Sequence, residues 1–383
     1  MVTLRSQIRR ATLLVAGILL STLAGAPAAA LDRSGWIRRV VERINAPSPR
    51  LDSAYIYQPK PRWNVTLSND LRRTGMSQSS AFEAHGVPTN LYCELWERLY
   101  KGVGIHAGYG SLTLGMSREV GRKSADYNKS FSLNYMGAGL GLHASYYDIR
   151  QPMAYTLTTG TPGSADYSSE SGTSDYPGRM KMITVEGIYA FNHSTFSYGS
   201  VYKGNKIQRR SAGSWLIGAK FVQGEVKIDP AEPISDLLYG LCRQSTLQAS
   251  VGAGYSYNFV PYHRQPAGAG TKGFRNFSIN LTGMPLLTVL DRHYSTRYVY
   301  NPLTGSLDSQ EKRPLGSTIR LNFVARGALA YSWDRFYLSL AGTYDHFSYR
   351  GTTKIVAPAL AADIKTAGHF SKWSTVLTFN VKF

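Results

Sequence analysis

The stretch HFSKWSTVLTFNVKF, residues 369–383, decides the fold of this chain, because its apolar and polar residues alternate. One parity holds Trp373, Leu377, Phe379, Val381 and Phe383, and the other holds Lys372, Ser374, Thr378, Asn380 and Lys382. Successive side chains of a strand point to opposite faces, so this segment has one apolar face and one polar face. A soluble edge strand could show the same alternation. A strand that ends the chain on an aromatic residue, behind an export signal, instead favours the closing strand of an outer-membrane β-barrel.

Residues 1–30 have the pattern of a cleaved signal peptide. Three arginines precede an apolar stretch over residues 11–24, and three alanines at 28–30 supply the small residues that a signal peptidase needs. A membrane anchor is the alternative, but the apolar stretch is short for crossing a bilayer. We therefore predict export without a helical anchor.

The formal net charge of +19 falls to +16 once the three arginines of the signal are removed. A strongly basic chain suggests anionic partners. Export argues against nucleic acid and favours outer-membrane lipids and the phosphates of lipopolysaccharide. A merely well-solvated surface explains the same charge.

Residues 31–51 form a separate N-terminal periplasmic segment with one expected helix over residues 34–45. The apolar residues at helical spacing are Trp36, Ile37, Val40, Val41 and Ile44. Pro47 and Pro49 end the pattern. This helix would lie along the inner leaflet or against the barrel mouth, or it is simply a short packed helix.

After Pro61 the hydrophobic period is two, and we assign residues 52–383 to a single barrel domain. Over residues 247–259 every odd position is apolar or aromatic, and every even position is glycine or polar. The same alternation recurs over residues 276–282 and 318–331. Repeated dyads of this kind predict an all-β fold, a transmembrane antiparallel up-and-down β-barrel in the cell outer membrane.

Turn signals divide this barrel into about fourteen strands, with twelve also compatible. The expected strands start near Trp63, Gly102, Ser111, Ser130, Ala138, Lys181, Thr195, Ser214, Thr246, Phe274, Leu286, Gly316, Phe336 and His369. Tight connections, including one at Met284–Pro285, then fall on the periplasmic side, and long ones at 151–178 and 302–315 fall outside. One long connection, 227–244, falls on the periplasmic side as an exception.

Cys93 and Cys242 are the only cysteines. They could form one disulfide in an exported chain, but the fourteen-strand topology puts them on opposite sides of the membrane, so we predict that they do not pair. No spacing of cysteine and histidine resembles a metal site, and we expect no cofactor.

Three local motifs resemble an outer-membrane barrel family of unknown function, domain-of-unknown-function family 4421, found in Bacteroidota. They are Asp52-Ser53-Ala54-Tyr55-Ile56 followed by Pro61-Arg62-Trp63, then Phe191-Asn192 leading into Phe196-Ser197-Tyr198, and Gln208-Arg209-Arg210-Ser211-Ala212-Gly213-Ser214. The resemblance spans most of the mature chain. It implies a barrel fold and an outer-membrane location, and it implies no reaction.

Ionisable residues on the polar parity are the candidate functional residues. Those expected to face the lumen are His106, His143, Glu186, Lys220, Arg320, Arg326, Lys372 and Lys382. A charge facing lipid at the bilayer midplane costs ~2–4 kcal/mol, so inward placement is favoured. An excess of lysine and arginine in a lumen would attract anions. The alternative is that these cations pair with Glu186 and Asp345 inside a closed barrel.

Catalytic signatures are absent from the sequence. Asp345 and His346 alternate in direction, so they cannot form one dyad, and His143 with Ser145 is a pair that chance supplies easily. We therefore expect a non-enzymatic barrel, either a small channel or solute-binding passage with a basic lumen, or a closed structural or assembly barrel that binds partners through its loops. A lipid-modifying enzyme is a lesser alternative. The strand ending in Phe383 is expected to engage the barrel-assembly machinery.

Overall fold

The barrel was analysed in a computed structural model, in which the chain divides into two units, Met1–Pro47 and Ser48–Phe383. The structure describes residues 51–59, 63–84, 87–96, 99–121, 127–137, 139–151, 154–159, 163–165, 167–173, 178–227, 243–265, 273–301, 306–315, 320–357 and 360–383. The expected signal peptide and the expected helix at 34–45 lie outside the described residues, as does Cys242.

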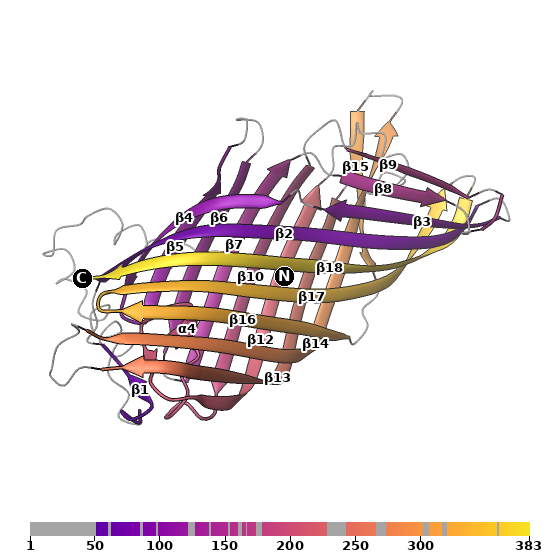
Figure 1. Ribbon diagram of the computed structural model, residues 1–383. Coiled ribbons are helices and arrows are strands. Elements are labelled where there is room, and N and C mark those ends of the chain that lie inside the picture. The colour runs from indigo at the N-terminus through magenta and orange to yellow at the C-terminus, as the bar shows by residue number, and fades with distance from the viewer. Residues whose placement is uncertain are drawn as a thin grey trace, which may run out of the picture. The chain divides into compact units, whose positions relative to one another are not determined.

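Twelve antiparallel strands close into a barrel (Figure 1). They are β2 (Trp63–Ala84), β4 (Tyr100–Tyr109), β5 (Leu112–Glu119), β6 (Tyr127–Met136), β7 (Leu140–Gln151), β10 (Gly178–Ala190), β12 (Ala212–Lys227), β13 (Arg243–Arg264), β14 (Arg275–Asn301), β16 (Leu321–Trp333), β17 (Phe336–Ala357) and β18 (Leu360–Lys382). The seam joins β18 to β2, with Phe379 opposite Leu67. The predicted all-β barrel is thus confirmed, with the lower of the two strand counts.

The orientation of the barrel follows from its turns. Trp63 at the start of β2 and Phe383 after β18 lie at the same end, where the Phe383 amide donates to the Trp63 carbonyl oxygen at 2.9 Å. The two-residue connections of β4 to β5 and of β16 to β17 lie at this end too. Because outer-membrane barrels have both termini and their short turns in the periplasm, this is the periplasmic end.

Two of the expected strands are not separate strands. Thr195 belongs to a non-strand segment between β10 and β12, and Leu286 lies inside the continuous β14. Pro285 therefore marks no turn. The β13–β14 ladder skips Met284 and Pro285, and a Cβ at the facing Gly252 would lie 2.0 Å from the Pro285 carbonyl oxygen. Proline cannot donate a ladder hydrogen bond, so a strand tolerates it where the ladder is interrupted, here opposite Gly252.

This correction changes the side assigned to the later connections. The segment between β12 and β13, residues 228–242, joins the external ends of its strands rather than their periplasmic ends. Cys93, in β3, also lies toward the external end. The expected placement of Cys93 and Cys242 on opposite sides of the membrane depended on fourteen strands and does not hold with twelve. That the two cysteines do not pair stays a prediction.

Extra strands prolong the external end. They are β3 (Val87–Trp96), β8 (Ala154–Thr159), β9 (Ser168–Thr173) and β15 (Ser306–Leu315). β3 pairs with the outer half of β2, and β15 pairs with the outer half of β14. The long external connections thus contain hairpins.

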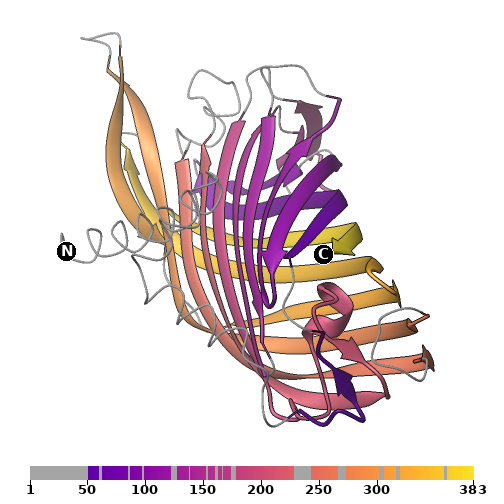
Figure 2. The ribbon, with the colours of Figure 1, turned by 90° about the vertical axis from the view of Figure 1, so that its left-hand side faces the viewer.

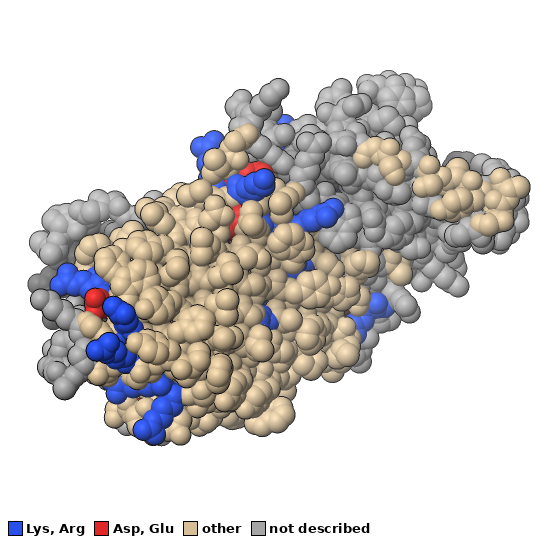
Figure 3. Space-filling view, viewed as in Figure 1, with Lys and Arg blue, Asp and Glu red and all other residues tan. Residues whose placement is uncertain are grey.

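The two faces of the wall differ in chemistry. Leu321, Trp215 and Leu281 are 71%, 68% and 67% exposed on the outside, whereas Ser256 and Asn258 are fully buried inside. The visible wall in Figure 3 is largely uncharged, with lysine and arginine gathered mainly toward its ends and edges. In the described part of the chain, no helix is long and apolar enough to cross a membrane.

Candidate functional site

The periplasmic end of the barrel is filled by two chain segments, residues 52–57 and 191–211, which we call the plug. The second segment contains α4 (Gly199–Tyr202) and β11 (Ile207–Gln208). β11 pairs with β1 (Ile56–Tyr57), which precedes the first barrel strand. Figure 2 shows this group of elements at one mouth of the barrel.

All three family-like motifs meet in the plug. The Arg209 amide donates to the Tyr55 carbonyl oxygen at 2.7 Å, and the Arg209 guanidinium donates to the Ser53 carbonyl oxygen at 2.7 Å. The Asp52 amide donates to the Ser194 carbonyl oxygen at 2.9 Å. The second motif was wrongly assigned to an expected strand near Thr195, whereas the third was expected to lead into the strand near Ser214, as it does where β12 begins at Ala212. The shared feature of the three motifs is contact with one another.

Aromatic and aliphatic side chains of the plug are buried inside the barrel. Phe196 and Val201 are 0% exposed and Tyr198 is 6% exposed. Phe196 and Tyr198 pack in one apolar cluster with Met136, Ile188, Ala190, Ala212, Leu216, Met284, Leu286 and Val324. Val201 packs against Ala328, Ala330 and Tyr337. Full burial of such a side chain stabilises by ~1.5–3 kcal/mol, so the plug and the surrounding wall share a hydrophobic core.

Gln208 is the polar centre of the plug and is fully buried. Its Oε1 accepts from the Ser197 amide at 2.9 Å and from Asn258 Nδ2 at 3.2 Å. Its Nε2 donates to the Thr195 and Arg210 carbonyl oxygens at 2.6 and 3.0 Å. A buried amide satisfied on every side fixes one arrangement of its neighbours, because any other leaves polar groups unpaired.

Hydrogen bonds fasten the plug to the surrounding wall. They run from Tyr337 to the Val201 carbonyl oxygen, from Lys382 to the Gly204 carbonyl oxygen, from Asn205 to the Met136 carbonyl oxygen, and from Tyr202 to the Asn280 side chain. The wall partners lie on β6, β14, β17 and β18. The plug is therefore held from several sides of the lumen.

Two lysines of the plug, the buried Lys206 and the half-buried Lys203, have no carboxylate at hydrogen-bond distance. Lys206 donates to the Met136 carbonyl oxygen at 3.2 Å. Burial lowers the pKa of Lys206 to about 8. Burial also lowers the pKa of Lys203 to about 8, against a partly offsetting attraction to Asp70. Carrying both charges inside the barrel costs the closed state some stability near neutral pH.

Two ion pairs cross the lumen above the plug. Lys220 on β12 lies 2.9 Å from Asp345 on β17, with 4% and 11% of the side chains exposed. Arg326 on β16 pairs with Glu186 on β10 and donates to the Tyr198 hydroxyl of the plug at 2.8 Å. Neither pair joins neighbouring strands, so each ties together distant parts of the wall.

The other sequence-predicted candidates do not join these pairs. His106 Nε2 shares a hydrogen bond with Ser68 at 3.0 Å, and His143 Nδ1 shares one with Asn134 at 2.5 Å. Arg320 is half-buried immediately before β16. Six residues separate it from Arg326, which is roughly 20 Å along a strand.

A stacked layer of Arg72, Lys372 and two tyrosines lies in the lumen on the seam side, and the sequence predicted only the inward direction of Lys372. The Arg72 guanidinium lies over the rings of Tyr100 and Tyr147, at 4.1 and 4.6 Å from their centroids. Lys372 lies 4.4 Å from the Tyr147 centroid and donates to its hydroxyl. The inward parity of Arg72 was readable, but its aromatic partners come from β4 and β7, which no local pattern connects to β2.

The pairs considered for catalysis do not assemble. Ser145 shares a 2.5 Å hydrogen bond with Thr184, whereas His143 contacts Asn134. Asp345 is buried on the lumen side and His346 is half-buried on the other face. Among the described residues, no group of histidine, cysteine, aspartate and glutamate is arranged to hold a metal ion.

A closed twelve-strand barrel with an apolar exterior and a polar interior defines an outer-membrane β-barrel protein. Within that class, the chain belongs to the family described as Domain of unknown function (DUF4421), which matches residues 50–362. A search of curated proteins gave no match.

Among solved structures, the chain is similar to the translocator domain of the autotransporter NalP from Neisseria meningitidis, with 11% identity, 93% of this chain and 97% of that chain covered, and a TM-score of 0.30. It is similar to the beta domain of the Bordetella autotransporter BrkA, with 8% identity, 82% and 99% coverage, and a TM-score of 0.30. It is also similar to a FadL homologue of Pseudomonas aeruginosa, with 10% identity, 84% and 90% coverage, and a TM-score of 0.24.

Proposed function

We propose that this protein is a closed, non-enzymatic outer-membrane barrel whose function resides outside its lumen, as a structural or assembly component that binds partners. The observation that carries this proposal is the plug, whose Phe196 and Val201 are fully buried inside the barrel. A pore lined for solute passage keeps its lumen wet. Here an apolar cluster occupies the periplasmic mouth instead.

The ion pairs support the same proposal. Lys220 and Arg326 were the cations expected to line an open basic passage, and each has a carboxylate partner across the lumen. Paired charges attract mobile anions only weakly, because the field of each cation is cancelled at short range. The external hairpins then remain as the surfaces available to partners.

A gated anion passage is the second candidate, and one observation favours it. Within the described residues, the interior cations named here, Arg72, Lys203, Lys206, Lys220, Arg326, Lys372 and Lys382, outnumber the interior acids Asp70, Glu119, Glu186, Asp291 and Asp345. If the plug left the mouth, this excess would face water and favour anions.

Ion conductance of the refolded protein in a planar bilayer with a salt gradient tests both candidates. Folding is first checked by gel mobility before and after boiling. The closed barrel predicts no steady current steps from wild-type protein, and current from Phe196→Asp, which places a charge in the apolar cluster of the plug. Phe191→Asp, at a side chain that is 61% exposed, is the matched control and is expected to stay silent. Steady anion-selective steps from the wild type would overturn the closed barrel in favour of the passage.

A further inference from the structure

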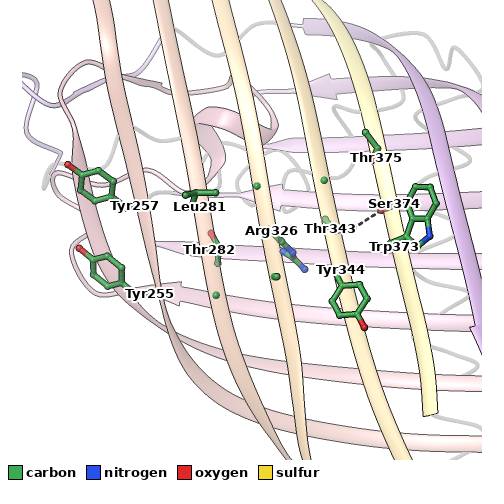
Figure 4. Close-up of a pocket in the computed structure, with 14 residues that line it drawn as sticks. Tyr255, Tyr257, Leu281, Thr282, Arg326, Thr343, Tyr344, Trp373, Ser374 and Thr375 are labelled. Carbon is green, nitrogen blue, oxygen red and sulfur yellow. Dashed lines mark hydrogen bonds between the residues drawn. The ribbon is translucent and has the colours of Figure 1, made fainter. Parts of the chain in front are cut away.

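The membrane-facing wall carries an apolar groove of about 710 Å³ (Figure 4). Its floor is made of residues with little or no side chain, namely Gly283, Ala325, Gly327 and Gly342. Tyr255 and Tyr257 of β13 stand on one side of it. Tyr344 of β17 and Trp373 of β18 stand on the other. The groove therefore crosses the outer surfaces of β14, β16 and β17.

Hydrocarbon must fill this groove in the membrane, because its floor lies on the lipid side of the strands. A Cβ added at Gly327 or Gly342 would have no neighbouring atom closer than 3.6 or 4.0 Å, respectively. The floor is therefore not covered by other side chains. A groove left empty would forfeit dispersion contacts along its whole lining. A flexible acyl chain can follow such a shape, and the flanking aromatic rings give it side walls.

A polar group lies one pleat beyond the groove toward the external end. His346 follows Tyr344 on the same face of β17, and Ser371 lies directly opposite His346 on β18. His346 Nδ1 and Ser371 Oγ share a hydrogen bond at 3.0 Å. The His369 ring lies 5.3 Å from the His346 ring, measured between centroids. Polar residues just beyond aromatic ones mark the level of the lipid head groups.

A cation lies on the neighbouring strand, level with the groove wall at Trp373. Arg73 of β2 is directly opposite Trp373 and its side chain is exposed on the outer face. A guanidinium and two imidazoles beside one apolar groove match a phosphate attached to acyl chains, since guanidinium pairs bidentately with phosphate. Because this polar rim lies toward the external end of the barrel, the phosphate would belong to a lipid of the outer leaflet.

We propose that this groove and its polar rim form a specific binding site for lipid A, the phosphorylated acyl lipid of lipopolysaccharide. An acyl chain lies over Gly327 and Gly342, and a phosphate lies against Arg73, His346 and His369. This site is on the outside of the wall, so it does not depend on whether the lumen conducts.

The Ser371–His346 contact serves binding in this proposal and not ester cleavage. A serine hydrolase needs a free oxyanion-binding donor beside its nucleophile. β17 and β18 are each paired on both sides, so the backbone N–H groups around Ser371 are committed to the sheet. One donor of this pair, either the His346 Nε2–H or the Ser371 hydroxyl, remains for a hydrogen bond to a head group.

The test is retention of lipid A by protein refolded into phosphatidylethanolamine vesicles containing lipid A, extracted in mild detergent and weighed by native mass spectrometry. Wild-type barrel is expected to retain lipid A in preference to phosphatidylethanolamine. Gly327→Leu, which fills the groove, and Arg73→Gln, which removes the cation, should each lower retention about tenfold, as expected for loss of a charge-assisted contact or of the acyl site.

Two variants on the far wall serve as matched controls. Ala107→Leu on β4 and Arg118→Gln on β5 change exposed outward positions in the same way and should leave retention unchanged. Folding of every variant is checked by the mobility shift on boiling. Equal retention by all variants, or no preference for lipid A, would overturn the proposal. So would a wild-type dimer that Gly327→Leu converts to monomer, because the groove would then bind a second copy.

Discussion

Lys220 and Asp345 form a 2.9 Å ion pair that joins β12 to β17 through the interior of the barrel. Both side chains are nearly buried, so each charge depends on the other for solvation. Replacing Lys220 by methionine leaves the Asp345 carboxylate buried and unpaired. We expect Lys220→Met to lower the free energy of unfolding by about 3–5 kcal/mol, measured by urea unfolding in detergent micelles.

A surface pair in the same chain provides the control. Lys227 lies 3.4 Å from Glu225, but about half of its side chain is exposed. Exposed pairs contribute ~0–1 kcal/mol, so Lys227→Met should change stability little. The double variant Lys220→Met/Asp345→Leu should recover most of the loss. A loss in the double variant as large as in Lys220→Met would argue that packing, and not the charge, stabilises this contact.

Gln208 is the residue whose loss should loosen the plug most selectively. Gln208→Leu keeps the volume but removes every hydrogen bond to Ser197 and Asn258, at a cost of about 1–3 kcal/mol for each buried group left unpaired. We expect trypsin to cleave the plug faster in this variant, after Lys203 or Lys206. Gln223→Leu, at an exposed position of β12, is the control. Equal cleavage rates in both variants would contradict a central role for Gln208.

The plug lysines predict an unusual dependence of stability on pH. The pKa of Lys206 falls from 10.5 to about 8 on burial, so the folded state binds fewer protons than the unfolded state between these values. Stability must therefore rise as the pH increases from about 8 to about 10.5, and the penalty is fully present below pH 8. The midpoint temperature of the boiling-dependent mobility shift should increase from pH 7.5 to pH 9.5.

Lys203→Met/Lys206→Met tests the source of that rise. Removing both amines should flatten the pH dependence, whereas Lys101→Met, at an exposed position of β4, should preserve it. A wild-type slope retained in the double variant would assign the effect to other groups.

Gly115 is predicted to be a close-packing position inside the lumen. A Cβ at Gly115 would lie 1.7 Å from His106 Nδ1, so alanine must displace the imidazole and break its hydrogen bond to Ser68. Overpacking of this kind costs about 1–3 kcal/mol. Gly115→Ala should therefore lower stability in urea, and His106→Ser should restore it in the double variant. Gly342→Ala has ordinary contacts and should be nearly neutral. Failure of His106→Ser to rescue would show that the clash lies elsewhere.

The barrel wall was predictable because alternation is a local property. Asn258 faces inward and Tyr257 outward in the structure as in the sequence pattern. The plug was not predictable in this way. Thr195, Phe196, Ser197 and Tyr198 alternate like a strand, yet the aromatic residues of that run pack inside the lumen rather than against lipid. Period-two patterning reports that one face is apolar, and it does not report what that face touches.

The ion-pair partners of the interior cations could not be predicted from the sequence, for a related reason. The inward direction of Lys220 and Arg326 follows from parity, but the choice of Asp345 and Glu186 as partners depends on how the wall curves to bring distant strands together. At Pro285 a local pattern was misleading, because we predicted a turn where β14 continues. This proline has the local signature of a turn, and only the facing Gly252 shows why the strand continues.

The seam between β18 and β2 closes beside a plug that is held from both edges of the sheet, by Lys382 of β18 and by β1, which precedes β2. The plug segment is held by β6, β14, β17 and β18, while β1, which pairs with β11, leads directly into β2. Elements at both edges of the unclosed sheet therefore contact the plug. Once Phe379 has met Leu67, no gap remains through which residues 191–211 could enter from the side. A plug that is seated before closure holds both edges of the sheet on one segment, so a chain with a faulty plug should close its seam more slowly than the wild type.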